Sequence, residues 1–341
     1  MQKQHVELEK RLANFLKVKN YIDRISNLGA LVIGDVMIDA YLFGSVNRMS
    51  PEAPVPVFLT HGNDSRVGGA ANVARNIRSL GAKAFLASVI GDDIHGAQFV
   101  DKIESLGIDG KACITEKGRK TTVKTRIIKD EEHVLRVDEE TTEDIKPSTL
   151  EKLKQSINSL VNSEKIDVII FEDYDKGLIN EELVEYVKDL AVENDIKITV
   201  DPKFKNFHNY KGVDLFKPNF KELCEGLETD IQIENKNQLK STIEEMHKLL
   251  QPKLSLTTLG GDGAWLHGDI VHHFHEKGIF RNIVDVSGAG DTVIATASLL
   301  LAAGASPKEM CHVANIAGGL VCEKSGVVVI HPDELFNEIA S

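Results

Sequence analysis

The chain has 341 residues, of which 42% are hydrophobic and 27% charged, and its formal net charge is −12. This size and composition exclude disordered and fibrous proteins and predict one sizeable α/β domain with a smaller appendage. The acidic excess argues against nucleic acid or an anionic membrane as a partner. The N-terminus lacks an apolar signal core, and the longest apolar run is far shorter than the ~20 residues that span a bilayer, so we expect a cytoplasmic protein. The four cysteines are widely spaced, which predicts free thiols rather than disulfides or a zinc site.

The first part of the chain combines a helical extension with the start of the main domain. Residues 1–28 carry apolar side chains at helical spacing and predict an amphipathic N-terminal helix, while residues 29–341 form the main domain. Residues 31–35 predict a buried strand, and Asp39 follows its carboxyl end. Ligands bind at that edge of open parallel sheets, so Asp39 could hold sugar hydroxyls, although it could also simply cap a turn.

A proline-rich segment and a glycine pair follow. Three prolines lie within residues 51–56, which excludes a helix and a central strand and predicts a surface arm or an edge strand. Gly68 and Gly69 then lead into a helix of small residues, with Asn72 just inside its first turn. Such an entry is suited to a helix end that faces a ligand.

Short β-like runs between residues 111 and 138 predict a small sheet that projects from the main domain. Residues 41–66 are expected to belong to the same projecting unit. Lys124, Arg126 and Arg136 cluster in it and could reach a phosphate on the substrate, or could lie on a solvated strand face.

The same small sheet has an apolar side, formed by Val123, Ile127, Val134 and Val137. So few strands cannot bury a face alone, and an exposed apolar sheet is a liability unless it is covered. The simplest cover is the same sheet of a second subunit, so the pattern predicts a homodimer.

From residue 148 onward, helical and β-like segments alternate, which predicts a mainly parallel sheet covered on both faces. Polar residues follow the expected strands, among them Asp173 and Lys203. Asn219 and Glu222 lie three apart at a helix start and could order water around Mg²⁺ on nucleotide phosphates. The spacing alone favours a structural capping box.

A glycine turn follows the last central strand, running from Thr258 through Gly261 to Gly263 and suited to passing close to a nucleotide. His273 and His275 share one strand face, and a hairpin strand is favoured there over a metal site because no further ligands are nearby. The chain has no G-x-x-x-x-G-K-[ST] sequence and no complete G-x-G-x-x-G, which argues against a P-loop kinase and a dinucleotide dehydrogenase.

The stretch around residues 285–292 organises the rest of the chain. The backbone N–H groups of Gly288, Ala289 and Gly290 open a helix of small apolar residues, so they and the helix dipole can bind a phosphoryl group. Asp291 lies at this anion site, where a carboxylate is suited to accept a proton from an attacking hydroxyl. The alternative is a glycine-rich turn in which Asp291 caps the helix.

Three of these motifs, at residues 68–72, 219–222 and 285–291, occur in the order found in ribokinase-like (phosphofructokinase-B type) carbohydrate kinases, which the chain resembles from about residue 30 onward. The resemblance implies a three-layer α/β/α domain with a mainly parallel central sheet and a small β-sheet lid, which in many members also forms the dimer interface. It also implies ATP and Mg²⁺, and it leaves open a monovalent cation such as K⁺.

The resemblance assigns roles residue by residue. Asp291 matches the catalytic base, and Gly288, Ala289 and Gly290 match the anion hole. The expected substrate-binding residues, including those suggested by the strand ends and the lid, are Asp39, Gly68, Gly69, Asn72, Lys124, Arg126, Asp173 and Lys203. The expected nucleotide-binding residues are Asn219, Glu222, Thr258, Gly261, Gly263 and Asn315, with Glu222 also holding the metal ion through water.

Within that family, residues 35–41, 48–57 and 201–203 resemble the kinases that phosphorylate D-glycero-β-D-manno-heptose 7-phosphate at O1, in ADP-heptose synthesis for lipopolysaccharide cores. Ser287 stands where Thr is common, and no H-x-G-H nucleotidyltransferase motif follows, so adenylyl transfer is expected to fall to another protein. The alternatives are a kinase for another sugar or sugar phosphate and a non-catalytic sugar-binding pseudokinase, against which the intact Asp291 motif speaks.

Overall fold

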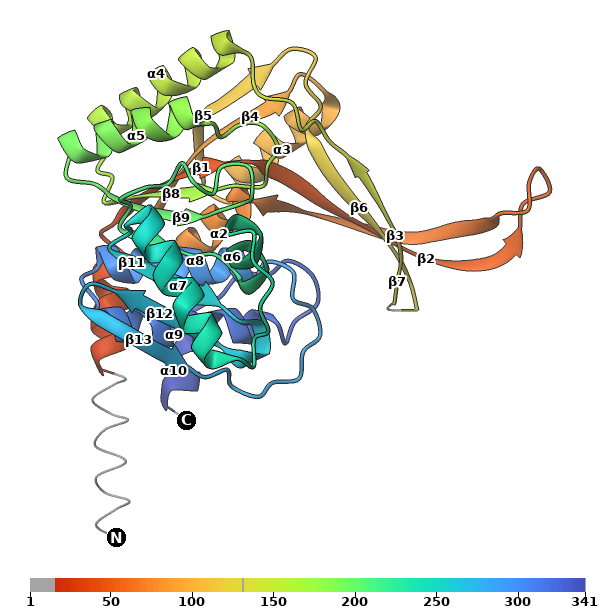
Figure 1. Ribbon diagram of the computed structural model, residues 1–341. Coiled ribbons are helices and arrows are strands. Elements are labelled where there is room, and N and C mark those ends of the chain that lie inside the picture. The colour runs from red at the N-terminus through yellow and green to blue at the C-terminus, as the bar shows by residue number, and fades with distance from the viewer. Residues whose placement is uncertain (1–15, 131, 341) are drawn as a thin grey trace.

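The computed structural model describes residues 16–130 and 132–340 (Figure 1). Residues 16–25 form a helix, whereas residues 1–15, the rest of the expected N-terminal extension, lie outside the described residues. All four cysteines are free thiols, as expected. No helix in the described part of the chain combines the length and apolar character needed to cross a bilayer.

The main body is built on a nine-stranded sheet. The strand order is β13-β12-β11-β10-β9-β8-β1-β4-β5, and every adjacent pair is parallel except the two made by β12. The strands are β1 (Gly29–Gly34), β4 (Lys83–Gly91), β5 (Asp109–Glu116), β8 (Val168–Glu172), β9 (Lys197–Asp201), β10 (Leu215–Phe216), β11 (Leu254–Thr258), β12 (Ala264–Gly268) and β13 (Val271–Glu276). This confirms the predicted mainly parallel α/β fold.

Helices cover both faces of this sheet, as Figure 1 shows. Along β1, Ala30 and Val32 enter one hydrophobic core while Leu31 and Ile33 enter the other, as the period of two in a strand requires. The first core contains residues of α2 (Ala70–Ser79), α3 (Ile94–Ser105), α8 (Ala289–Ala302), α9 (Pro307–Val321) and α10 (Pro332–Ala340). The second contains residues of α4 (Pro147–Ser163), α5 (Glu181–Glu193), α6 (Phe220–Gly226) and α7 (Lys236–Leu250).

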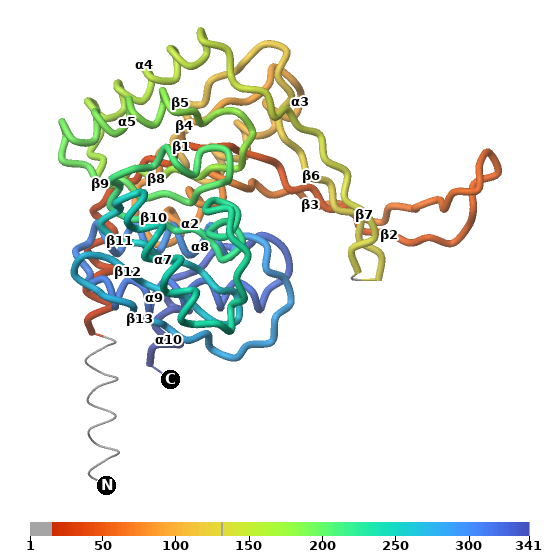
Figure 2. Tube along the Cα trace, in the orientation of Figure 1, coloured from red at the N-terminus to blue at the C-terminus, as the bar shows by residue number. Residues whose placement is uncertain are grey.

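A second, four-stranded sheet projects from this body (Figure 2). Its order is β3-β2-β6-β7, from β2 (Val36–Met49), β3 (Pro56–Gly69), β6 (Thr122–Lys129) and β7 (Glu132–Glu139). The proline-rich segment forms the tip between β2 and β3, and β3 is an edge strand that begins at Pro56, where a missing N–H is tolerated.

The small sheet differs from the sequence expectation at one strand. Residues 111–116 were expected in it, but they belong to β5 and pair in parallel with β4 at the edge of the large sheet. Ala112 of β5 is fully buried in the second core. Burial of this strand against the main body therefore outweighed its closeness in sequence to β6 and β7.

Candidate active site

The loop that precedes α8 is fixed by its own carboxylate. Asp285 Oδ1 accepts a hydrogen bond from the Ser287 amide and Oδ2 accepts one from the Gly326 amide, both at 2.9 Å. Gly288 then caps α8 with φ of 79°, and a Cβ added there would lie 2.8 Å from Asn72 Nδ2. Both the positive φ and the close side chain require glycine at this position.

The start of α8 leaves backbone donors free. No side chain caps the helix. The Ala289 amide donates to the Val286 carbonyl at 3.3 Å, so this amide, expected in the anion hole, is partly engaged. Within the described residues no acceptor serves the amides of Gly288 and Gly290. These two N–H groups, with the positive end of the helix dipole, form the anion-binding element.

Asp291, one residue further along, is a buried carboxylate with two donors. Its Oδ2 accepts from Asn72 Nδ2 at 2.7 Å and its Oδ1 from the Tyr174 hydroxyl at 3.0 Å. Burial raises the pKa of Asp291 to about 6, although the hydrogen bond from Asn72 opposes this change. The Asn72 Oδ1 atom is itself buried without a partner. Asp291 is therefore a proton acceptor whose pKa is close to neutral, and the neighbouring Asn72 Oδ1 is an unused hydrogen-bond acceptor.

Three further charged side chains lie behind Asp291. Lys217 Nζ lies 2.7 Å from Asp201 Oδ2, and both side chains are buried. Burial alone would lower the pKa of Lys217, but Asp201 and Glu222 raise it above its ordinary value. Burial and the neighbouring Asp201 and Asp291 raise the pKa of Glu172 well above its usual range. One oxygen each of Glu172 and Asp201 is buried without a partner.

The expected capping box at the start of α6 is present. The Asn219 side chain accepts from the Glu222 amide at 2.9 Å, and Glu222 Oε2 accepts from the Asn219 amide at 2.8 Å. Glu222 Oε1 also pairs with Lys203, whose ammonium lies 5.3 Å from the centre of the Tyr174 ring. The Asn219 backbone forms an isolated bridge with Thr258. These contacts join the capping box to the glycine turn and to Asp291.

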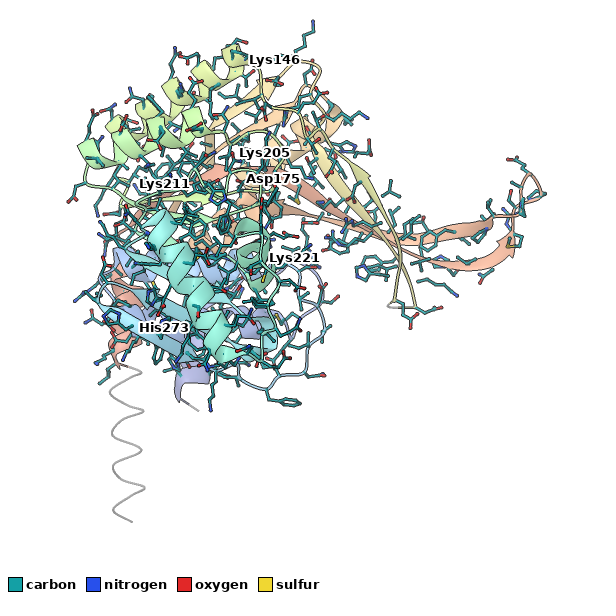
Figure 3. The ribbon with its side chains drawn as sticks, in the orientation of Figure 1. Lys146, Asp175, Lys205, Lys211, Lys221 and His273 are labelled. Carbon is teal, nitrogen blue, oxygen red and sulfur yellow. The ribbon has the colours of Figure 1, made fainter. Side chains whose placement is uncertain are left out.

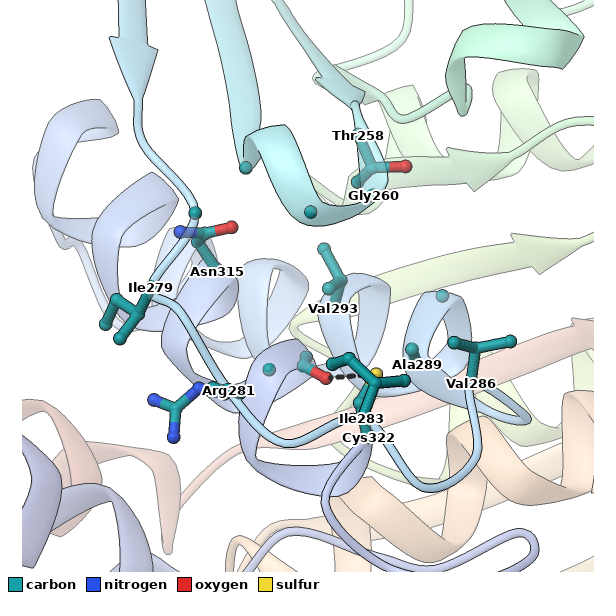
Figure 4. Close-up of a pocket in the computed structure, with 16 residues that line it drawn as sticks. Thr258, Gly260, Ile279, Arg281, Ile283, Val286, Ala289, Val293, Asn315 and Cys322 are labelled. Atoms are coloured by element: carbon teal, nitrogen blue, oxygen red, sulfur yellow. Dashed lines mark hydrogen bonds between the residues drawn. The ribbon is translucent and has the colours of Figure 1, made fainter.

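A cavity of about 250 Å³ adjoins the start of α8 (Figure 4). Four of the expected nucleotide-binding residues line it, namely Thr258, Gly261, Gly263 and Asn315, together with Ala289 and Gly290. Apolar walls come from Ile279, Ile283, Val286 and Val293. The cavity thus combines a glycine turn, apolar walls suited to a flat ring and, at one end, the start of α8.

The lid side of the site is organised around Asp39 on β2. Asp39 forms an ion pair with Arg126 of β6, and a Cβ at Gly68 would overlap its carboxylate. Lys124 lies 3.5 Å from Asp138 and 3.8 Å from Glu140, so its charge is shared with acidic residues of the lid region.

Asp173, an expected substrate contact, is a buried carboxylate with its own donors. Asp173 is 1% exposed, and its Oδ2 accepts from the Tyr210 hydroxyl at 2.7 Å and from Asn206 Nδ2 at 3.0 Å. Its Oδ1 accepts from the Asp175 amide at 2.9 Å. Both oxygens are thus engaged by the protein, as a buried carboxylate requires. The substrate contact of Asp173 stays a prediction.

A short segment after α9 joins the lid to the start of α8. Arg66 of β3 donates from Nη1 to the carbonyls of Ser325 and Val327, at 3.2 and 3.1 Å. The Val327 amide donates to the Tyr41 hydroxyl of β2 at 3.3 Å. Val327 also lies against Gly288, since a Cβ added to Gly288 would be 3.3 Å from its Cγ1.

His273 and His275 lie on β13, which pairs antiparallel with β12 as the hairpin strand that the sequence favoured. His273 lies beside α7, where its Nε2 is 2.6 Å from Glu244 Oε1, and Trp265 donates to its Nδ1 at 3.1 Å (Figure 3). His275 Nε2 instead lies 2.8 Å from the Asp262 carbonyl. Across the described residues, no group of three His, Cys, Asp or Glu side chains is arranged to hold a metal ion.

The chain can be assigned to a known protein family. Residues 28–333 match the model of the pfkB family carbohydrate kinases. The chain is a member of the pfkB carbohydrate kinase family. This confirms the resemblance found in the sequence, and it makes the protein a phosphotransferase with an alcohol group as acceptor.

Within this family, the kinase is similar in sequence to HldE proteins. It is 35% identical over 318 residues to the bifunctional protein HldE of Sulfurimonas denitrificans, covering 93% of this chain and 64% of that protein. It is 37% identical over 309 residues to HldE of Helicobacter hepaticus, covering 91% and 63%. The kinase therefore spans less than two thirds of these relatives.

A solved structure supports the fold. The potassium complex of phosphofructokinase-2 from Escherichia coli superposes on the kinase with a TM-score of 0.73, at 17% identity, over 92% of this chain and 99% of that one.

Some of the kinase's candidate site residues escaped the sequence analysis. Tyr174, Glu172 and Lys217 were not assigned to the site, although all three lie at or just beyond the carboxyl ends of β8 and β10. That position was the available signal, because strand ends of a parallel sheet meet at one edge. The apolar loop residues that line the cavity had no comparable signal.

Proposed function

We propose that this kinase transfers the γ-phosphoryl group of ATP to the anomeric hydroxyl of D-glycero-β-D-manno-heptose 7-phosphate. The product would be the 1,7-bisphosphate, made in the cytoplasm for ADP-heptose and lipopolysaccharide core synthesis. The substrate assignment is supported by the resemblance of residues 35–41, 48–57 and 201–203 to heptose 7-phosphate kinases, and by about 36% identity to the kinase part of HldE proteins.

The observation that carries the chemistry is the position of Asp291. Its carboxylate lies at the start of α8, within hydrogen-bond distance of Asn72 and Tyr174. There it would take the proton of the attacking hydroxyl while the free amides of Gly288 and Gly290 stabilise the transferred phosphoryl group. A pKa near 6 leaves Asp291 mostly ionised at neutral pH and therefore ready to accept a proton.

The sugar would lie between Asp291 and the lid. Asp39 and the buried Oδ1 of Asn72 are acceptors for its hydroxyls, and Gly68 and Gly69 let the chain approach closely. The substrate phosphate would be bound by Arg126 and Lys124 after an exchange of carboxylate partners on the lid, since both cations are ion-paired without ligand.

The nucleotide would occupy the cavity between the glycine turn and Asn315. Its Mg²⁺ enters as part of the ATP complex, and Glu222 would hold it through water, aided by the unpaired oxygens of Glu172 and Asp201. The ion supplies charge neutralisation to the phosphates. A monovalent cation such as K⁺ is a further component, and its support is the potassium complex of the structural relative.

The lid would close over the sugar, exclude water and pair with a second lid in a homodimer. Val134, Leu135 and Val137 of β7 are 46–56% exposed, and Phe43 on β2 and Leu59 on β3 of the same sheet are 41% and 57% exposed. Consecutive side chains of a strand point to opposite faces, so these residues lie on both faces of the lid. Exposed apolar residues of this kind need a cover, and symmetry makes a second lid the simplest one. By contrast Val123, expected on the apolar side of this sheet, is buried.

A coupled assay of ADP release tests the proposal. The purified chain would be offered ATP with a panel of sugars and sugar phosphates that includes heptose 7-phosphates, fructose 6-phosphate and ribose. We expect the highest kcat/KM with the heptose 7-phosphate of β configuration. A higher value with another sugar would refute the substrate assignment, and no turnover with any of them would favour a sugar-binding pseudokinase.

A further inference from the structure

A basic cleft at the base of the lid has no role in the proposed reaction. It has a volume of about 180 Å³ and lies between β3, α2 and α3. Its walls carry three cationic side chains, Arg66, Arg75 and Lys102. None of the three lines the nucleotide cavity.

Arg75 is the cation without a partner. Its Nη1 atom is buried and has no acceptor. Among the described residues, neither a carboxylate nor a carbonyl bonds to any nitrogen of this guanidinium. Burial and the neighbouring Arg66 lower the pKa of Arg75, so its positive charge is unfavourable where it stands. A buried donor left unpaired destabilises the fold, and more so when it is charged.

The other charges of the cleft compensate Arg75 only in part, because Asp64 favours its charged form while burial and Arg66 oppose it. The nearby carboxylate of Asp64 is engaged by Arg66 Nε at 2.8 Å. Lys102 Nζ donates to the Ser65 carbonyl at 3.0 Å, which uses one of its three N–H donors. The cleft therefore keeps a surplus of positive charge, and the residues that carry the unused donors, Arg75 and Lys102, both line it.

We propose that this cleft binds a phosphate group, with Arg75 and Lys102 as its donors. A guanidinium presents parallel N–H groups that match two oxygens of a phosphate, and an ammonium adds a point charge. The small volume admits such a group while the remainder of a phosphate ester would lie outside. The inference does not depend on the identity of the kinase's sugar.

Thermal unfolding in inorganic phosphate tests this site. Saturating Mg·ADP keeps the nucleotide cavity occupied, so added phosphate reports on other sites. A ligand that binds only the folded state raises the unfolding temperature in proportion to ln(1 + [L]/Kd). We expect this rise in the native kinase and its loss in Arg75→Gln. The matched control is Arg78→Gln, on the same helix, whose exposed guanidinium donates to the Ala82 carbonyl; it should keep the rise.

An equal rise in all three proteins would overturn the proposal. If Arg75→Gln does not fold, the native protein still decides the question, because the Nε–H signal of Arg75 can be followed by NMR and assigned with Arg75→Lys. Titration with inorganic phosphate and, separately, with glycerol 3-phosphate distinguishes a free anion from a phosphate ester. A signal that stays unmoved at tens of millimolar of both would also overturn the proposal.

Discussion

Asp291→Asn should make the kinase more stable and nearly inactive at once. Asp291 is 5% exposed, and burial raises its pKa from the ordinary 3.8 to about 6. Between these two values the folded state keeps a proton that the unfolded state has released, so stability falls as the pH rises. The loss corresponds to about 3 kcal/mol and is complete above pH 6. The side chain of Asn carries no ionisable proton, so the variant does not suffer this loss of stability.

Urea unfolding at several pH values measures this effect. At pH 8 we expect Asp291→Asn to exceed the native protein in unfolding free energy by up to about 3 kcal/mol, reduced by any hydrogen bond that Asn loses to Tyr174 or Asn72. Below pH 4 the difference should vanish. Asp130→Asn, at a side chain that is 80% exposed, is the control and should show no such dependence.

Turnover supplies the second measurement on the same variant. Loss of a general base should lower kcat by roughly 10²–10⁴, and kcat/KM of the native enzyme should fall as the pH drops below about 6, because Asp291 is then protonated. Near-native turnover of Asp291→Asn would refute its role as the base. A variant less stable than the native protein at pH 8 would refute the electrostatic reasoning.

Three other substitutions test separate parts of the site. Arg126→Ala should raise KM for a phosphorylated sugar more than for its unphosphorylated analogue; an equal change would argue against a phosphate contact. Val134→Asp should give monomers with a raised sugar KM, whereas a native protein that is monomeric by light scattering at micromolar concentration would contradict the dimer. Gly288→Ala, at φ of 79° and with its Cβ 2.8 Å from Asn72 Nδ2, should cost roughly 1–3 kcal/mol in urea unfolding and lower kcat, while Gly62→Ala, which has open space, should do neither.

The sequence predicted those features whose causes are local. Glycine pairs and turns mark places where the chain must bend or approach a ligand, so the starts of α2 and α8 and the turn at residues 260–263 could be recognised without a structure. The alternation of strands and helices likewise predicted the parallel sheet, which the structure confirms.

Other features depend on contacts between distant segments. Tyr174 and Asp291 are 117 residues apart, and only the fold brings the hydroxyl to the carboxylate. The same holds for β5, whose place was decided by pairing and burial against β4 rather than by its closeness in sequence to β6 and β7. The sequence did not indicate that the guanidinium of Arg75 lacks an acceptor, because this can be seen only when all its spatial neighbours are known.

The segment at residues 325–327 has a consequence for how the two substrates bind. It is held on one side by Arg66 and Tyr41 of the lid, and on the other it meets Gly288 and is fixed by Asp285. If the lid closes when sugar binds, it should therefore move the backbone at Gly288, where the start of α8 presents its amides to the nucleotide phosphates. Binding of either substrate should then tighten the other by the same factor, since such a coupling free energy is reciprocal. ATP without sugar would therefore bind more weakly, which limits its wasteful hydrolysis.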